Sequence, residues 1–442
     1  MKRRRKIVFA LSAFAAVLAV AALVAVFYDA PCPDDSDLRP VIKTVADEDN
    51  AMVVMRELSK TLKIAHEDFP ELELTDGSSV KKFYSVLYSD LSGESEGDDR
   101  MVRLIIEKNN PAIALFFEAI KKPELQFGVA SKEINDIFQD NHTILALINT
   151  MRLMQSRWKH KMQYGLSKEV MSELYLVRNF AQRYMAAPDG RMGTFLSGLS
   201  ADAMCLAAAM QSLEQFSDKS ICLEISHRLS REELNKDSFI KMMKGSYAFH
   251  EGCLRLREPG MYFFPPVSRS SWRYFYKLNM TRARLCQLTR DVIKDASNDI
   301  SPVFDQATRE TYENVDELRH IIRPNSSGAA IAVASVIDCE TVYIRMLNMQ
   351  AITRQIACAF ALRAYWLDYH TLPKSLDVLV PAYMDSVPED PFIKKPMQYD
   401  ASKTLLYCAG PERLVDDGSF AFEEDAEPFG RRAFVILDWA KK

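Results

Sequence analysis

The sequence predicts a mainly α-helical protein: an N-terminal transmembrane helix, an antiparallel helical array outside the cytoplasm and a small C-terminal α+β module. Three observations predict this. Residues 7–27 are apolar, apolar side chains recur at helical spacing from about residue 101 to 300, and prolines with short strand-like segments fill the last hundred residues. The 442 residues are 48% hydrophobic and 26% charged, which is typical of a folded protein.

The apolar run is long enough to cross a bilayer. Ser12 is the only polar side chain within residues 7–27, and a helix of that length spans roughly 30 Å of hydrocarbon. The basic residues 2–6 precede the run and acidic residues follow it. By the positive-inside rule, the basic tail stays in the cytoplasm and the rest of the chain is exported. We therefore expect a single-pass anchor at residues 7–28.

A cleaved signal peptide is the alternative interpretation of this run. The apolar region of a signal peptide is normally shorter, and it ends in a small-x-small cleavage site. Here the run ends in FYDAP, residues 27–31, which contains no such site. Lipoprotein processing at Cys32 is also disfavoured, because Ala-Pro stands directly before it. The sequence favours a retained anchor.

Residues 29–100 are expected to form an acidic stalk and loop region. Carboxylates gather in the loop 89–100, but their spacing does not match an EF-hand calcium loop. The chain has 56 Lys and Arg against 60 Asp and Glu, a net charge of −4, and its basic tail makes the exported part more acidic still. Phosphate binding needs clustered basic residues, so we expect no nucleic-acid partner.

The eight cysteines are compatible with an oxidising compartment, but they show neither a disulfide framework nor a C-x-x-C metal pair. Cys205, Cys286 and Cys358 fall within helical patterns, where a buried thiol that acts as a small apolar residue is expected. The cysteines are residues 32, 205, 222, 253, 286, 339, 358 and 408.

Residues 101–330 are predicted to form the helical array. Several segments carry apolar side chains at i, i+3, i+4 and i+7, and each such stripe must be buried against a neighbour. Asn110 and Ser167 are predicted to cap two of these helices, and Ser230 with Glu233 matches a capping box for another. No fixed repeat period indicates a known solenoid family.

No sequence motif in the chain indicates catalysis. The phosphate-binding, dinucleotide-binding, serine-nucleophile and zinc-protease patterns are all missing. His250 and Glu251, with Cys253 beside them, come nearest to a catalytic or metal cluster, but a second pair of ligands is lacking. The aromatic stretch 262–276 could form a ligand pocket or a partner surface, although a proline turn with its aromatics packed between helices is the favoured explanation. We assign no catalytic, cofactor-binding or metal-binding residue.

The C-terminal segment 331–442 has the most specific pattern. A helix is expected to end near Tyr369, and prolines then hold an irregular connector. Residues 398–400 and 404–409 are predicted to pair as a hairpin, and residues 433–437 to add a third strand. This order resembles the C-terminal domain of type II secretion major pseudopilins. The residues that match that family's pattern are Ala364, Tyr365, Asp368, Leu372, Pro373, Val387, Pro388, Asp390, Pro391, Phe392, Lys395, Pro396, Tyr399, Tyr407 and Gly410.

The chain also departs from the pseudopilin pattern. It lacks that family's processing site before the apolar helix, and more than 300 residues separate this helix from the pilin-like module, so we expect no pilin-like polymerisation. Family members can bind calcium after the hairpin, and Asp416 and Asp417 would be the oxygen ligands here. Because Pro411-Glu412 replaces the usual small-Asp step, we expect an acidic surface turn and no cofactor. The whole chain is similar to uncharacterised membrane-anchored bacterial envelope proteins.

These observations predict a protein of the bacterial inner membrane, with a cytoplasmic N-terminus and a periplasmic bulk. We expect a scaffold or interaction module without a catalytic role, whose partners are other envelope proteins of a type II secretion or pilus-like assembly. The alternatives are an envelope enzyme with its site near His250 and Glu251, or a ligand-binding protein with its site in the helical domain.

Overall fold

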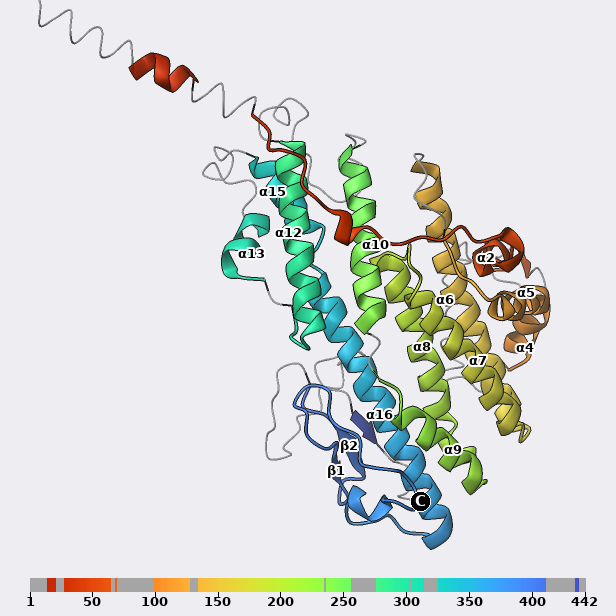
Figure 1. The fold of residues 1–442 in the computed structure, drawn as a ribbon. Helices are drawn as coiled ribbons and strands as arrows, with labels where there is room; N and C mark the ends of the chain where they lie inside the picture. The colour runs from red at the N-terminus through yellow and green to blue at the C-terminus, as the bar shows by residue number, and fades with distance from the viewer. Residues whose placement is uncertain are drawn as a thin grey trace, which may run out of the picture. The chain divides into compact units, whose positions relative to one another are not determined.

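The fold of the computed structural model is mainly helical with one small antiparallel sheet, which confirms the coarse fold class (Figure 1). The chain forms two compact units. The small unit comprises Met1–Val41 and Met243–Thr341, and the large unit comprises Ile42–Met242 and Val342–Lys442. Each unit therefore combines stretches of the chain that the sequence assigned to different domains. The domain boundaries expected from the sequence stay a prediction. The structure describes residues 14–20, 28–64, 68–69, 99–127, 134–233, 236–255, 276–302, 304–313, 325–410 and 434–436.

Only the middle of the expected anchor is described. Residues 14–20 are helical and their apolar side chains are exposed, while the rest of residues 7–27 lies outside the described part of the chain. The anchor therefore stays a prediction. Among the described residues, one helix, α8 (Met192–Gln211), is long and apolar enough to cross a membrane. Its most apolar window is 61% buried inside the protein, as in a core helix.

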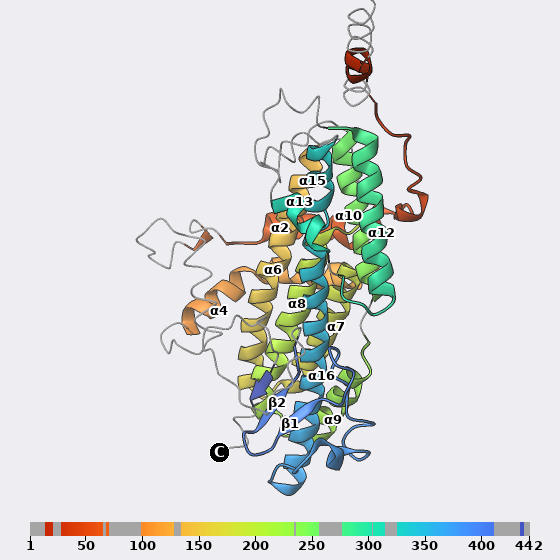
Figure 2. The ribbon, with the colours of Figure 1, turned by 90° about the vertical axis from the view of Figure 1, so that its left-hand side faces the viewer.

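In the large unit, α8 packs against both α6 and α7 (Figure 2). Small residues allow this close approach: a Cβ added at Gly198 would lie 2.6 Å from Cγ of Met185 on α7. The helices of this unit are α2 (Ala51–Thr61), α4 (Asp99–Lys108), α5 (Asn110–Lys121), α6 (Ile134–Gln163), α7 (Ser167–Met185), α8 and α9 (Lys219–Ser230), with the start of α10 (Lys236–Arg255) and most of α16 (Cys339–Tyr369).

The core of the large unit is built from aromatic and aliphatic side chains of these helices. Phe116 on α5 meets Phe180 on α7 edge to face, with ring centroids 5.7 Å apart. Trp158 is fully buried, and its indole N–H donates to Glu173 at 3.0 Å, which satisfies the one polar atom of that side chain. The helical stripes predicted from the sequence thus do face a common core.

Three predicted helix caps differ from the structure. Asn110 is the first helical residue of α5 rather than its cap. The residue before it is Asn109, whose buried side chain bonds the backbone of Lys63. Ser167 is likewise the first residue of α7 rather than its cap. The capping box at Ser230 is wrong, because Ser230 ends α9 and its hydroxyl donates to the carbonyl of His227.

The C-terminal module follows the predicted order. Helix α16 ends at Tyr369, the connector contains the 3₁₀ turn η6 (Leu376–Leu379), and β1 (Gln398–Asp400) pairs antiparallel with β2 (Leu405–Tyr407). The strand β3 (Phe434–Ile436) pairs with the other edge of β2. Asp390 is fully buried in the connector and accepts the N–H groups of Phe392 at 2.8 Å and Ala409 at 2.6 Å. It therefore joins the Asp-Pro-Phe turn to the end of the hairpin.

The small unit holds the acidic segment that follows the expected anchor. Asp29 accepts the backbone N–H groups of Asn279 and Met280 at the start of α12, and Asp37 pairs with Arg290 at 2.6 Å. The sequence suggested a stalk here, but Asp29 and Asp37 both bind α12. The other elements of this unit are η1 (Ser36–Leu38), the end of α10, α12 (Leu278–Ser297), α13 (Gln306–Glu313) and α15 (Ser326–Ala334).

Candidate functional site

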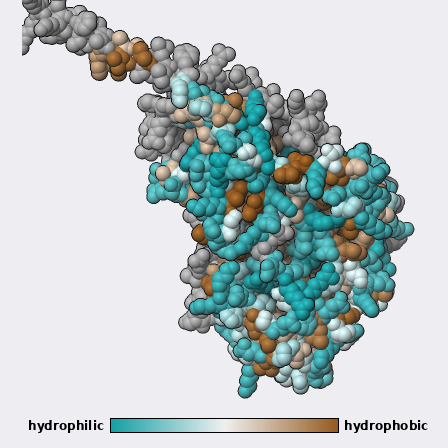
Figure 3. All heavy atoms as spheres, viewed as in Figure 1, coloured by the Kyte–Doolittle hydropathy of each residue, from teal (hydrophilic) through white to brown (hydrophobic). Residues whose placement is uncertain are grey.

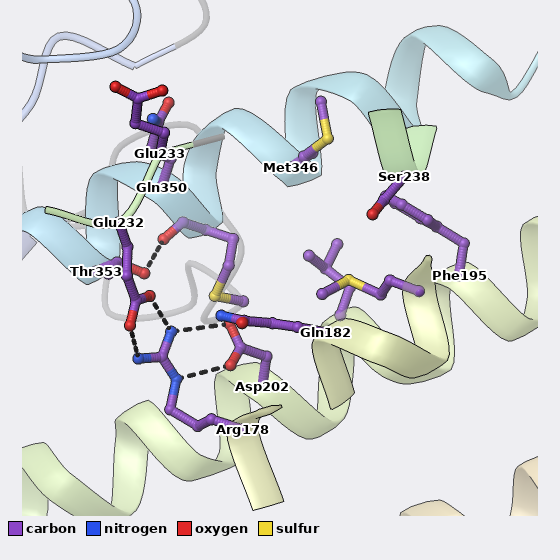
Figure 4. Close-up of a pocket in the computed structure, with 13 residues that line it drawn as sticks. Arg178, Gln182, Phe195, Asp202, Glu232, Glu233, Ser238, Met346, Gln350 and Thr353 are labelled. Carbon is purple, nitrogen blue, oxygen red and sulfur yellow. Dashed lines mark hydrogen bonds and ion pairs between the residues drawn. The ribbon is translucent and has the colours of Figure 1, made fainter. Parts of the chain in front are cut away.

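The candidate site is a pocket of about 270 Å³ in the large unit, to which four helices and one loop contribute (Figure 4). Helices α7 and α8 form one wall, and α16 forms another. The segment after α9 and the first turns of α10 complete the lining. The residues that line the pocket are Arg178, Gln182, Met185, Phe195, Leu199, Asp202, Glu232, Glu233, Ser238, Met346, Met349, Gln350 and Thr353.

A buried arginine organises the charged end of the pocket. Arg178 on α7 is 4% exposed and lies between two carboxylates. Its Nε and Nη2 donate to Asp202 on α8 at 2.7 and 3.2 Å, and its Nη1 and Nη2 donate to Glu232 at 2.9 and 2.8 Å. Both contacts are bidentate, which fixes the plane of the guanidinium and the position of each acid.

Burial and charge act in opposite directions on these groups. Burial alone would lower the pKa of Arg178, but the Asp202 and Glu232 carboxylates outweigh it and hold this pKa above its ordinary value. Burial raises the pKa of Glu232, and the Arg178 charge only partly opposes this. Two carboxylates face Arg178, and Glu233 also lines the pocket, so the lining has an excess of negative charge.

The opposite end of the pocket is apolar. Phe195, Leu199 and Met346 are buried there, and Figure 4 places Phe195 and Met346 away from the Arg178 ion pairs. Thr353 lies beside Glu232 at the charged end, and its hydroxyl donates to the carbonyl of Met349 at 2.9 Å. The pocket thus has an acidic end and an apolar end.

The charges of the pocket constrain the ligand that it can hold. Arg178 is already neutralised by two carboxylates, so it is poorly placed to hold a phosphate or carboxylate ligand. Four N–H···O bonds fix the two acids against that arginine. Among the described residues, no group of three His, Cys, Asp or Glu side chains is arranged to hold a metal ion.

The His250–Glu251 pair lies elsewhere, in the small unit. Glu251 is 2% exposed, and its carboxylate contacts Arg282 at 2.9 Å and Arg39 at 3.2 Å, with Arg255 as a third partner. Three guanidinium groups surround one carboxylate, so Glu251 is placed to hold α10, α12 and the segment after the anchor together. This geometry suits a structural ion-pair centre, and a general base would need a carboxylate open to substrate.

The remaining sequence candidates are only partly described. Residues 262–275 of the aromatic stretch, and Asp416 and Asp417, lie outside the described residues. Tyr276 is described, and its hydroxyl donates to the carbonyl of Leu254 at 3.5 Å. All eight cysteines lie in the described part and are reduced; Cys205, Cys286 and Cys358 are buried as expected.

The sequence did not lead us to Arg178, because its partners lie 24 and 54 residues away along the chain. One signal could have pointed to the site. Asp202 is the only charged residue in the 20 residues of α8. A carboxylate inside so apolar a helix requires a buried cation as its partner.

Comparison with known proteins gives no relative. No family model, no curated protein and no solved structure matches this chain. The resemblance to pseudopilins and to envelope proteins therefore stays a prediction from the sequence.

Proposed function

We propose that this protein is a non-catalytic interaction module of the bacterial envelope, anchored in the inner membrane by residues 7–28 with its bulk in the periplasm. Its partners would be other envelope proteins, namely components of a type II secretion or pilus-like assembly. The sequence resemblance of the C-terminal module supports the choice of partner. The charge asymmetry around the apolar run supports the orientation.

The observation that carries this proposal is that the connector after α16 follows directly on a helix buried in the core of the large unit. Helix α16 is buried almost throughout residues 355–364, so the connector that follows it has a fixed base. Apolar side chains of the connector nevertheless face solvent: Val378 is 48% exposed and Val380 is 36% exposed. Tyr369, the last residue of α16, is 59% exposed. In Figure 3, apolar patches lie among hydrophilic ones at the end of the large unit where Figure 1 draws this connector. Exposed apolar side chains on a rigid support are suited to protein contact.

Site-specific crosslinking in cells tests the proposal. A photoreactive amino acid placed at Val378 in the full-length protein is expected to crosslink to a pilin-like or secretion-assembly component, identified by mass spectrometry. The matched control carries the same amino acid at Glu224, an exposed position on α9. Crosslinks from Val378 to this chain alone, or the same products from both positions, would refute the proposed contact.

A second candidate function is the binding of a small ligand in the large unit. The pocket at Arg178 favours it, because the pocket combines enclosed volume, a rigid charged end and an apolar end. This function is compatible with a scaffold, since ligand binding between α7, α8 and α16 would stabilise the helices that support the connector.

A further inference from the structure

The charge of the pocket at Arg178 selects the sign of its ligand. Arg178 and Asp202 cancel each other, and Glu232 and Glu233 remain as an excess of negative charge. An anion entering this pocket would meet that excess and would find the arginine already engaged. A cation would meet the carboxylates of Asp202 and Glu232, which Arg178 holds rigidly in position.

The hydrogen bonds leave these carboxylates able to accept more. Each oxygen of Asp202 and Glu232 accepts one hydrogen bond from Arg178. An ionised carboxylate has about four acceptor positions, so two remain on each side chain. An ammonium group has three N–H donors of matching charge, and Glu233 is exposed at the edge of the pocket, where it can attract such a group.

The apolar end selects the rest of the ligand. Phe195, Leu199 and Met346 offer a surface that suits a hydrocarbon or aromatic body, and Met185 and Met349 also line the pocket. Methionine side chains adapt to such bodies and make favourable contacts with rings. A strongly hydrated inorganic cation would gain nothing from this end of the pocket.

We propose that this pocket binds a small organic ammonium ion whose charged nitrogen lies at Asp202 and Glu232 and whose apolar body lies on Phe195 and Met346, with Glu233 at the pocket edge adding to the attraction. The proposal deepens the ligand-binding function suggested above and rests on it. It commits to a primary amine with one apolar group, because the pocket of about 270 Å³ has one acidic end and one apolar end.

Calorimetry with three probes of equal size tests the charge requirement. Benzylamine, which is protonated at neutral pH, benzyl alcohol and benzoate share one apolar body and differ in charge. The full-length protein in lipid nanodiscs is titrated with each, and empty nanodiscs correct for partitioning into lipid. Benzylammonium is expected to bind at least about tenfold more tightly than benzyl alcohol, and benzoate is expected not to bind. Equal affinity for the first two probes, or no binding of benzylammonium, overturns the proposal.

Two variants locate the binding in the pocket. Glu233→Gln is expected to weaken benzylammonium binding by roughly twofold to fivefold, because this carboxylate is exposed, and to leave benzyl alcohol unaffected. Met346→Gln changes the apolar end and is expected to weaken both. Glu224→Gln removes a carboxylate from an exposed position on α9 outside the pocket and should change neither. Unchanged benzylammonium affinity in both pocket variants would place the binding elsewhere and refute the proposal. The crosslinking result at Val378 does not depend on any of these titrations, so the two proposals can fail separately.

Discussion

A charged side chain inside a helical core is stable only when its partners are rigid. Arg178 satisfies this condition through four hydrogen bonds to two carboxylates that come from separate segments. Removing one member of such a cluster leaves the others buried without compensation, which costs more than the cluster itself contributes. The cluster therefore makes the relative positions of α7, α8 and the segment after α9 specific.

This argument predicts the effect of replacing Arg178. In the Arg178→Met variant, Asp202 and Glu232 face each other without a cation, and we expect the free energy of unfolding to fall by about 3–5 kcal/mol. The triple variant Arg178→Met, Asp202→Asn, Glu232→Gln removes the charges together and should lose less. Urea unfolding of the full-length protein, followed by circular dichroism, measures both. A single variant as stable as the parent would mean that the cluster is not needed for folding.

Asp390 has a comparable role in the C-terminal module. Its two oxygens accept one backbone N–H each, from Phe392 and from Ala409. In Asp390→Asn one of these N–H groups would face an amide NH₂, so we expect a loss of about 1.5–3 kcal/mol. Hydrogen exchange at the amide of Ala409 should accelerate in this variant and stay unchanged in Asp377→Asn, which alters an exposed position on η6. Equal exchange in the two variants would contradict this role of Asp390.

At the scale of elements, apolar periodicity predicted α5, α6, α7, α8 and α16, and prolines with short apolar runs predicted the hairpin and its third strand. Helix α2 was missed, because it lies in the segment expected to be a stalk and loop. Periodicity is a local property, so it could not identify which segments meet. The misplaced cap is a separate failure: the local pattern at Ser230 and Glu233 matches a capping box, yet Ser230 ends α9 and its hydroxyl donates to the carbonyl of His227. The charged end of the pocket escaped prediction because its three parts lie far apart in the chain.

Close packing of α7 and α8 predicts opposite effects for two glycines of α8. A Cβ at Gly198 would lie 2.6 Å from Met185 Cγ and 3.0 Å from the carbonyl oxygen of Ala181, so Gly198→Ala should cost about 1–3 kcal/mol despite the better helix propensity of alanine. At Gly193 the nearest atom is Ile144 Cδ1 at 3.7 Å, an ordinary contact. Gly193→Ala should therefore be neutral or stabilise by up to about 1 kcal/mol. Thermal unfolding of the two variants tests this prediction. Equal shifts of the melting temperature would exclude tight α7–α8 packing at Gly198.

Ion pairs between α9, α16 and the connector predict how the large unit responds to acid. Hydrogen bonds from Arg231 lower the pKa of Asp385 below its ordinary value of 3.8, and a hydrogen bond from Lys219 does the same for Asp368. A carboxyl whose pKa is lowered by folding adds stability above its ordinary pKa. That stability is lost as the pH falls through the lowered value.

The contribution of these two pairs to the melting temperature should therefore be the same at pH 7 and at pH 5. Below about pH 4 this contribution is lost and the melting temperature should drop. The double variant Asp368→Asn, Asp385→Asn should show a shallower drop, because neither side chain can then titrate. Parent and double variant are compared by thermal unfolding across the acid range, with Asp377→Asn as the control. Parallel curves for all three proteins would mean that these pairs do not contribute.

At the scale of the whole molecule, export to the periplasm would place eight reduced cysteines in an oxidising compartment. Their burial is consistent with such an environment. Six of the eight are buried, and burial raises the pKa of Cys222 and of Cys358 to about 12, so both are protonated and unreactive at neutral pH. Cys32 is exposed, directly after the expected anchor, and Cys253 is half-buried.

This distribution yields a test of the predicted orientation. A membrane-impermeant maleimide added to intact spheroplasts should label Cys32 before any lysis, because residues after the anchor would lie on the outer side of the inner membrane. Peptide mapping by mass spectrometry identifies the labelled cysteine, and Cys32→Ser should remove most of the signal and leave a minor part at Cys253. The buried cysteines should react only after unfolding in urea. Labelling of Cys32 that requires lysis would place the bulk of the chain in the cytoplasm, and the envelope function proposed for the connector would then have to be abandoned.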